Sequence, residues 1–381
     1  MKMMILLLFL LPARRGYAQE EQAEKAMQSA MDEVFSGLDF SGLEPAFVPG
    51  FEGEMSVEAL VRALSAGETI SPEAAVAWVL SSFFDALTGL GKLMLAIMLP
   101  VLLATLLMRL LTPQRGSLFS LSRSVCFVLI LMPVLLCVFS ELEHTKKAIT
   151  AMTQRMDKLL PMLLTLLTAL GGSASSAFLH PMVVAASGSM VFLAREVTLR
   201  LVMCTCAVTA VNHLSDRAHL TRMAQLLRSA VCWLLGVSFT VFLGAMSLQG
   251  VCSASIDGIM LRAAKYAVDN FVPVVGGMFS DTMDTLVGCT LIVKNALGVA
   301  AVVVLLGVVL APLMRTFAVV MVMRLSAALL EPVADAQVVR AIADFSRIIV
   351  LFLITMLCVG TMYFLLIVQM LLVGNLTAIL R

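Results

Sequence analysis

Residues 261–285 read LRAAKYAVDNFVPVVGGMFSDTMDT, a charged stretch between strongly apolar segments. Arg262, Lys265 and Asp269 recur at i, i+3 and i+7, a spacing that places them on one face of a helix. A proline and two glycines then interrupt the helical pattern. Polar groups at membrane depth are costly unless they are paired or face water. Two interpretations follow: a broken, re-entrant element that lines a polar passage or partner-binding groove, or an amphipathic helix on the membrane surface.

Other polar and helix-breaking residues raise the same question. Proline and paired glycines free backbone groups, which then need partners in protein or water. His180 and Pro181 lie in a second interrupted apolar segment, where the histidine is either a polar group of a cavity or an interfacial residue. The candidate lining or docking residues are Arg262, Lys265, Asp269, Asn270, Pro273, Gly276, Gly277, Asp281, Asp284, Lys294, His180, Pro181, Gly171 and Gly172.

The composition indicates an integral membrane protein. Of the 381 residues, 60% are hydrophobic and only 13% are charged, whereas soluble domains carry about 25% charged residues. The net charge of +1 gives no basic footprint for nucleic acid. Sequences of the GxxxxGK[ST], HExxH and GxSxG types are absent, and the cysteines and histidines lack metal-ligand spacing. We therefore expect no enzyme, no cofactor and no metal site.

The N-terminal segment MKMMILLLFLLPARRGYAQ has the pattern of a secretory signal peptide. Lys2 supplies the basic region, residues 3–11 form an apolar core too short to span a bilayer, and Ala18 precedes the expected cleavage point. Cleavage there places the new N-terminus outside the cytoplasm. Residues 19–88 have soluble-protein character, with short helices expected at 56–66 and 71–87, and we interpret them as an extracytoplasmic module.

The rest of the chain predicts an all-α, polytopic membrane protein with about six to eight transmembrane or re-entrant elements. Basic loops at 112–123 and 213–228 are expected in the cytoplasm by the positive-inside rule. The apolar spans are residues 90–111, 124–140, 198–211, 229–249, 296–313 and 348–373.

Residues 159–194 do not fit a simple span. Neither apolar half, on either side of Gly171 and Gly172, reaches the roughly 20 residues that a crossing needs. One alternative is a single long, broken helix, and the other is a re-entrant hairpin. The basic loop at 213–228 is cytoplasmic only if residues 159–194 cross an even number of times, which favours the hairpin.

A two-fold internal repeat is suggested by the order of these parts. Gly171-Gly172 and Gly276-Gly277 each precede a span, a basic segment and a second span. Both units cross an even number of times, so they would be parallel rather than inverted. The resulting division is 1–18 signal peptide, 19–88 extracytoplasmic region, 89–158 transmembrane hairpin with an amphipathic helix, 159–250 first membrane repeat and 251–381 second membrane repeat.

Three stretches carry a resemblance to a known family. They are TVFLGAMSLQGVCSASIDGIMLRAAKYAVDNFVPVVGGMFSDTMDTLVG at 240–288, AFLHPMVV at 177–184 and GNLTAILR at 374–381. On these residues the chain resembles the stage III sporulation protein AE family of endospore-forming bacteria. The resemblance covers essentially the whole chain after the first 80 or so residues and is most specific at 240–285.

The resemblance implies a role in sporulation. Such proteins lie in the mother-cell membrane around the forespore, and they act in a transenvelope channel or secretion-like complex required for late forespore development. The implied partners are other stage III sporulation membrane proteins, including a separate ATPase and ring-forming subunits, and a forespore membrane protein. The N-terminal region would face the extracytoplasmic side.

Two other functions are compatible with the broken elements. A stand-alone secondary transporter for a small solute would drive uptake with a gradient and depend on Asp269 or Asp281. A non-conducting membrane scaffold would tolerate neutralisation of the charged face at 262–269.

Overall fold

The computed structural model describes residues 32, 35–38, 40, 46–47, 54–68, 72–111, 117–170, 173–214, 220–271 and 276–379. For residues 249–271 and 276–287 the description covers the backbone alone. The predicted signal peptide at 1–18, the glycine pair Gly171-Gly172 and Pro273 lie outside the described residues.

A small N-terminal unit precedes the long helices. Strand β1 (Ala46–Phe47) pairs antiparallel with β2 (Glu54–Met55), and helix α2 (Val57–Ser65) follows. Ser56 caps α2, because its Oγ accepts a hydrogen bond from the Ala59 N–H at 3.2 Å. Leu60 and Val61 on α2 are fully buried, and α2 packs against α9. The helix predicted at 56–66 is therefore confirmed.

Arg62 ties the chain before the strands to α2. Its guanidinium pairs with Asp32 at 3.0 Å and with Glu58 at 3.3 Å, and it lies 4.7 Å from the ring centroid of Phe35. The hydrogen bond from Arg62 to Asp32 raises the pKa of the guanidinium. The ion pairs are exposed and add little stability, so the buried Phe35 ring is the main anchor of this segment.

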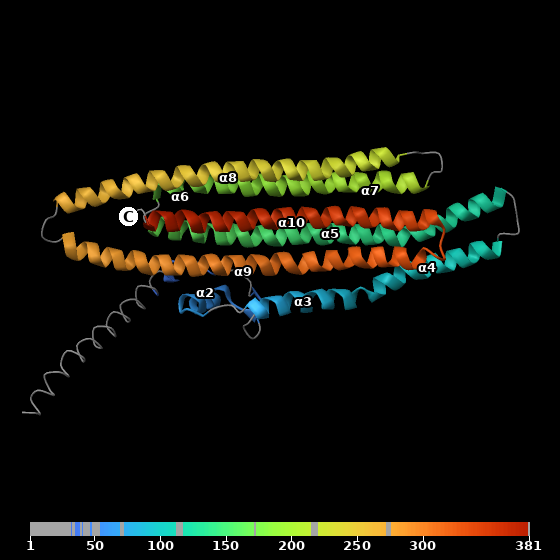
Figure 1. The fold of residues 1–381 in the computed structure, drawn as a ribbon, viewed down its shortest axis with the longest axis horizontal. Coiled ribbons are helices and arrows are strands. Elements are labelled where there is room, and N and C mark those ends of the chain that lie inside the picture. Colours follow the sequence, from blue (N-terminus) through green and yellow to red (C-terminus); the bar gives the residue numbers. More distant parts are fainter. Residues whose placement is uncertain are drawn as a thin grey trace, which may run out of the picture.

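Long helices form the rest of the molecule (Figure 1). Helix α3 (Pro72–Gly89) starts at the proline where the sequence predicted it, and α4 (Gly91–Leu111) follows after one residue. Along the chain come α5 (Ser117–Ala169), α6 (Ser173–Phe192), a π-helical turn η1 (Leu193–Thr198), α7 (Leu199–Leu214), α8 (Thr221–Phe271), α9 (Gly276–Leu330) and α10 (Ala336–Ile379).

These helices lie side by side in an elongated up-and-down bundle (Figure 1). Helices α6, η1 and α7 form one continuous rod. The end of α7, the start of α8 and the α9–α10 turn lie at one end of the bundle, and the ends of α5 and α8 lie at the other with the starts of α6 and α9. The α4–α5 hairpin extends beyond the first end, past the α9–α10 turn.

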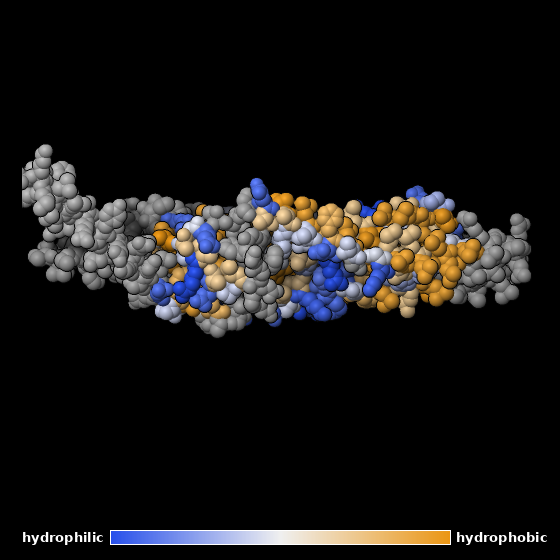
Figure 2. Space-filling model, turned by 90° about the horizontal axis from the view of Figure 1, so that it is seen from below, coloured by the Kyte–Doolittle hydropathy of each residue, from blue (hydrophilic) through white to orange (hydrophobic). Residues whose placement is uncertain are grey.

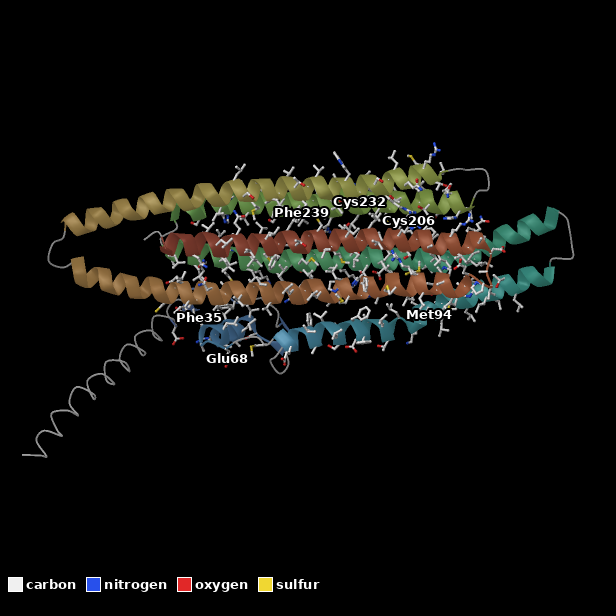
Figure 3. All side chains as sticks on the ribbon, viewed as in Figure 1. Phe35, Glu68, Met94, Cys206, Cys232 and Phe239 are labelled. Atoms are coloured by element: carbon white, nitrogen blue, oxygen red, sulfur yellow. The ribbon has the colours of Figure 1, made fainter. Side chains whose placement is uncertain are left out.

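Helix α10 is the centre of the packing. It contacts α9, α5, α8 and α7, and Phe345, Phe352 and Tyr363 on α10 are almost fully buried. Side chains fill the space between neighbouring rods along the bundle, with Cys206 on α7 and Phe239 on α8 among them (Figure 3). Helices α9 and α10 approach closely at Gly360, where a Cβ atom would lie 2.8 Å from Val309 Cγ1. Small residues allow this approach.

Within the described residues, five helical segments are long and apolar enough to cross a membrane. These segments are Val76–Leu103, Phe127–Ala169, Thr221–Leu248, Gly288–Leu330 and Ala336–Val373. The prediction of an all-α protein with several helices able to cross a membrane is therefore confirmed. The described residues hold five such segments against the six to eight elements predicted, and the span predicted at 198–211 is not among them. The surface seen in Figure 2 is mainly hydrophobic toward the end that holds α4, whereas hydrophilic residues gather nearer the middle and the opposite end.

Two expectations about helix boundaries are wrong. The span at 124–140, the polar stretch 141–158 and the apolar stretch 159–169 form one helix, α5. Likewise the span at 229–249 continues without a break through residues 262–269 to Phe271 in α8. The polar stretch of α5 stays helical because it buries Glu141, Thr145, Ile149, Met152 and Met156 on one face.

The segment 159–194 reverses direction between α5 and α6, as the hairpin alternative requires, and the single-broken-helix alternative is wrong. Helix α6, the second half of this segment, is not separate from the span expected at 198–211, however, because η1 joins α6 to α7. The predicted domain boundaries after residues 158 and 250 fall inside α5 and α8. The two-fold repeat stays a prediction.

Candidate functional site

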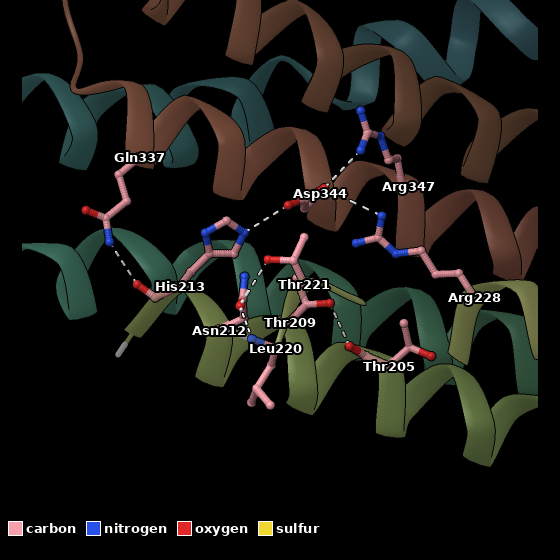
Figure 4. Close-up of polar contacts among 10 residues, drawn as sticks. All are labelled: Thr205, Thr209, Asn212, His213, Leu220, Thr221, Arg228, Gln337, Asp344 and Arg347. Atoms are coloured by element: carbon pink, nitrogen blue, oxygen red, sulfur yellow. Dashed lines mark hydrogen bonds and ion pairs between the residues drawn. The ribbon is translucent and has the colours of Figure 1, made fainter. Parts of the chain in front are cut away.

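A cluster of charged side chains joins three helices near the α7–α8 and α9–α10 turns (Figure 4). His213, at the end of α7, places its Nε2 3.0 Å from Oδ2 of Asp344 on α10. Arg228 on α8 approaches Oδ1 of the same carboxylate at 3.5 Å, and Arg347 donates to it at 3.1 Å. The side chains of His213 and Arg228 are largely buried. We call this group the Asp344 cluster.

Neutral groups complete the Asp344 cluster. Gln337 Nε2 donates to the His213 carbonyl oxygen at 3.0 Å and so joins the first turn of α10 to the end of α7. Asn212 Oδ1 accepts from the Leu220 N–H at 2.8 Å, which links the end of α7 to the start of α8 (Figure 4). Both bonds fix helix ends, where backbone groups lack partners within their own helix. The three helices are thereby held in register at this end of the bundle.

A second polar contact lies deeper, between α5 and α9. Glu141 is 2% exposed, and its Oε2 accepts a hydrogen bond from the Thr316 hydroxyl at 2.9 Å. A buried carboxylate is costly unless it is paired or hydrogen-bonded. Glu141 therefore marks a site where the interior of the bundle is polar.

Further polar contacts fix α10 against its neighbours. The Tyr363 hydroxyl donates to Thr153 Oγ1 on α5 at 3.2 Å, and Gln369 Nε2 donates to the Met246 carbonyl oxygen on α8 at 3.0 Å. Lys294 on α9 is 1% exposed, and its Nζ donates to the Leu371 carbonyl oxygen at 2.7 Å and to Asn375 Oδ1 at 3.1 Å. Both of these acceptors are neutral, so within the described part of the chain the Lys294 ammonium group is held by dipoles.

The structure describes the side chains of only some of the lining or docking residues predicted from the sequence. Lys294 is buried between α9 and α10, while His180 and Pro181 lie exposed on α6. Helix α8 contains four candidates, and α9 starts with the two glycines and contains two aspartates, but all of these lie where the backbone alone is described. These are Arg262, Lys265, Asp269, Asn270, Gly276, Gly277, Asp281 and Asp284. Their role as a lining or docking surface stays a prediction.

Sequence reasoning missed the Asp344 cluster and Glu141. Residues 213 and 344 are far apart in the chain, and no local pattern pairs them. Glu141 did have a local signal, because it lies four residues before Thr145 and eight before Ile149 on the buried stripe of α5. The sequence pattern predicts an amphipathic helix after the span at 124–140, but it does not show which side of that helix faces the core.

Comparison with known proteins identifies the family. The family model described as stage III sporulation protein AE matches residues 55–374. The chain belongs to the stage III sporulation protein AE family. It is similar to stage III sporulation protein AE of Bacillus subtilis (strain 168), with 27% identity over 333 residues, covering 87% of this chain and 84% of that protein. No solved structure matches the chain.

This stage III sporulation protein AE family member carries its buried polar groups within the matched region. The Asp344 cluster, Glu141 and Lys294 all lie between residues 55 and 374. Glu141, Arg228, Lys294 and Asp344 lie on helical segments that are apolar enough to cross a membrane, whereas His213 lies on α7, outside the five segments found among the described residues. The chain is therefore a sporulation-related membrane protein whose polar contacts lie inside its helical bundle. Among the described residues no group of three or more histidine, cysteine or acidic side chains is placed to hold a metal ion.

Proposed function

We propose that this chain is the multi-span membrane subunit of a transenvelope channel or secretion-like complex that links mother cell and forespore during sporulation. The observation that carries the proposal is the family match across residues 55–374. It covers both the apolar helices and the contacts that join them. By the same proposal the chain is not an enzyme, and a separate ATPase subunit supplies the energy.

The lengths of the helices support a transenvelope role. Helix α9 has 55 residues and α8 has 51, which at 1.5 Å per residue makes them about 83 Å and about 77 Å long. The hydrocarbon core of a bilayer is about 30 Å thick. A helix of this length that crosses the membrane must also project well beyond it. Such a projection suits a subunit that contacts partners between two membranes.

The positions of the arginines indicate which end of the bundle lies in the cytoplasm and which end projects on the extracytoplasmic side. Arg222, Arg228, Arg340 and Arg347 lie near the α7–α8 and α9–α10 turns, and the positive-inside rule favours the cytoplasm for that end. The opposite end, with the α8–α9 turn, then lies on the extracytoplasmic side, where ring-forming subunits and the forespore membrane protein would dock. The cytoplasmic end would face the ATPase.

Affinity purification of the tagged chain from sporulating cells tests this proposal. We expect the ATPase and ring-forming subunits to co-purify with it, whereas an unrelated polytopic membrane protein carrying the same tag should not retain them. Failure of every such partner to co-purify, under conditions that keep the chain folded, would contradict the proposal.

A reconstitution experiment separates the competing functions. A stand-alone secondary transporter would take up a solute into liposomes along an ion gradient, and Asp281→Asn would abolish the uptake. The proposed subunit should show no such uptake alone. A non-conducting scaffold would support sporulation equally well after Arg262, Lys265 and Asp269 are neutralised together.

A further inference from the structure

A pocket opens beside the Asp344 cluster, between α7, α8 and α10. It has a volume of about 700 Å³, and most of its lining residues are polar. The lining comes from the last turns of α7 and the first turns of α8 and α10. A pocket of this size can accept a small ligand or headgroup.

The charge of the pocket favours an anion. Three arginines line it, Arg228, Arg340 and Arg347, against the single carboxylate of Asp344. Two positive charges therefore stay unmatched among the lining side chains when His213 is neutral. Arg228 Nε is buried and makes no hydrogen bond within the described part of the chain. A buried donor without an acceptor is costly, and an anionic oxygen would satisfy it.

Two helix N-termini add to this positive potential. The first turn of α8 contributes Thr221 and Ala224 to the pocket, and the first turn of α10 contributes Ala336 and Gln337. The N-terminal end of a helix carries a partial positive charge and favours anions, phosphate groups in particular. Arginine side chains, with paired N–H donors, also suit phosphate oxygens. The excess of arginines, the buried Arg228 Nε and the two helix N-termini therefore all favour an anionic ligand that carries phosphate.

The position of the pocket favours a phospholipid headgroup. The membrane-compatible segments of α8 and α10 begin at Thr221 and Ala336, both of which line the pocket. Basic pockets between membrane helices at such a boundary bind anionic headgroups. We propose that this pocket binds a phosphate group, carried by an anionic phospholipid headgroup or by a free phosphate compound. This inference goes beyond the proposed complex and needs only the isolated full chain.

Lipid binding to the purified full chain tests the proposal. Native mass spectrometry would count the phosphatidylglycerol and phosphatidylcholine molecules retained after delipidation and titration with each lipid. We expect at least one phosphatidylglycerol site with about tenfold tighter binding than any phosphatidylcholine site. Thermal unfolding with and without inorganic phosphate provides the second arm, because a free phosphate ligand would raise the unfolding temperature without lipid.

Matched arginine variants assign the binding to the pocket. Arg340 is exposed and makes no ion pair among the described residues, so Arg340→Gln should leave the fold intact while weakening binding about tenfold. Arg228→Gln should weaken it at least as much. Arg222 lies on the first turn of α8 without lining the pocket, and Arg222→Gln is the control that should retain binding.

Each outcome of these binding experiments either supports or overturns the proposed phosphate site. Tight phosphatidylglycerol binding that Arg340→Gln weakens supports the headgroup source, and stabilisation by inorganic phosphate with the same dependence supports the free source. Equal binding of both lipids with no effect of phosphate overturns the proposal. An equal loss with Arg222→Gln also overturns it, since the charge would then act without the pocket.

Discussion

Helix α10 and the α3–α4 layer are both strongly apolar, but they occupy opposite situations in the bundle. In an apolar 18-residue stretch of the membrane-compatible segment of α10, 56% of the residues are buried inside the protein, against 12% in the corresponding stretch of α3 and α4. The α3–α4 segment also exposes large apolar side chains, namely Val76, Leu80, Phe84, Leu95, Leu99, Leu102 and Leu103. Mean apolarity alone therefore does not distinguish a helix at the centre of the bundle from one at its surface.

Polar contacts and small residues make the distinction. Helix α10 hydrogen-bonds to α5 through Tyr363, to α7 through Asp344 and to α8 through Gln369. The contact of α3 with α9 includes the ring pair Phe83–Phe317, with centroids 5.8 Å apart, which is apolar. In lipid, apolar burial gives helices little reason to associate, so close packing and interhelical hydrogen bonds decide which helix is central. Helix α10 has both close packing and interhelical hydrogen bonds. The following variants test this contrast between α10 and the α3–α4 layer.

The largest effect is expected from removing aromatic volume. Phe352 on α10 is fully buried, so Phe352→Ala should lower the free energy of unfolding by about 3–5 kcal/mol. Phe84 on α3 is 60% exposed, and Phe84→Ala should cost less than about 1 kcal/mol. Unfolding of both variants in mixed detergent micelles measures the difference. Equal losses would show that α3 is as central to stability as α10.

Removing a carboxylate should give the next effect. Asp344→Ala leaves the largely buried Arg228 without its ion-pair partner, and we expect a loss of about 2–3 kcal/mol because the pair is only partly buried. Asp85→Ala, at an exposed position on α3, should change stability by less than about 0.5 kcal/mol. The same unfolding assay applies. A stable Asp344→Ala variant would mean that the Asp344 cluster does not hold the three helices together.

Filling a close helix contact should have a smaller effect. A valine at position 360 must displace Val309, so Gly360→Val should cost about 1–3 kcal/mol through overpacking. Gly236 on α8 has open space where its Cβ would lie, and Gly236→Val is the matched control for β-branched helix propensity. Thermal unfolding compares the two. If both variants lose the same stability, the approach of α9 to α10 is not limited by Gly360.

The smallest effect concerns one hydrogen bond. Tyr363→Phe removes the bond to Thr153 while keeping the buried ring, with an expected loss of about 1 kcal/mol. A double-mutant cycle with Thr153→Val isolates the coupling between α10 and α5. A coupling energy indistinguishable from zero would remove this bond from the account of why α10 is central.

Local patterns predicted the elements well where the signal was local. The proline at the start of α3 marked a helix start that the structure confirms, and the short helix predicted at 56–66 is α2. Local patterns failed at the middle of α5, because hydropathy averages over a helix and hides one buried face of a polar stretch. Residues 141–158 are polar overall, yet Ile149 and Met152 are fully buried there.

Composition and apolar runs predict an all-α membrane protein, and short motifs indicate the stage III sporulation protein AE family, because all three are properties of neighbouring residues. The packed bundle is needed to see that α10 lies at the centre, that Asp344 contacts His213 and Arg228, and that two helix N-termini line one pocket. Those features depend on which helices pack together and in what register. Packing and hydrogen bonds between distant segments set that register, and no local periodicity encodes it.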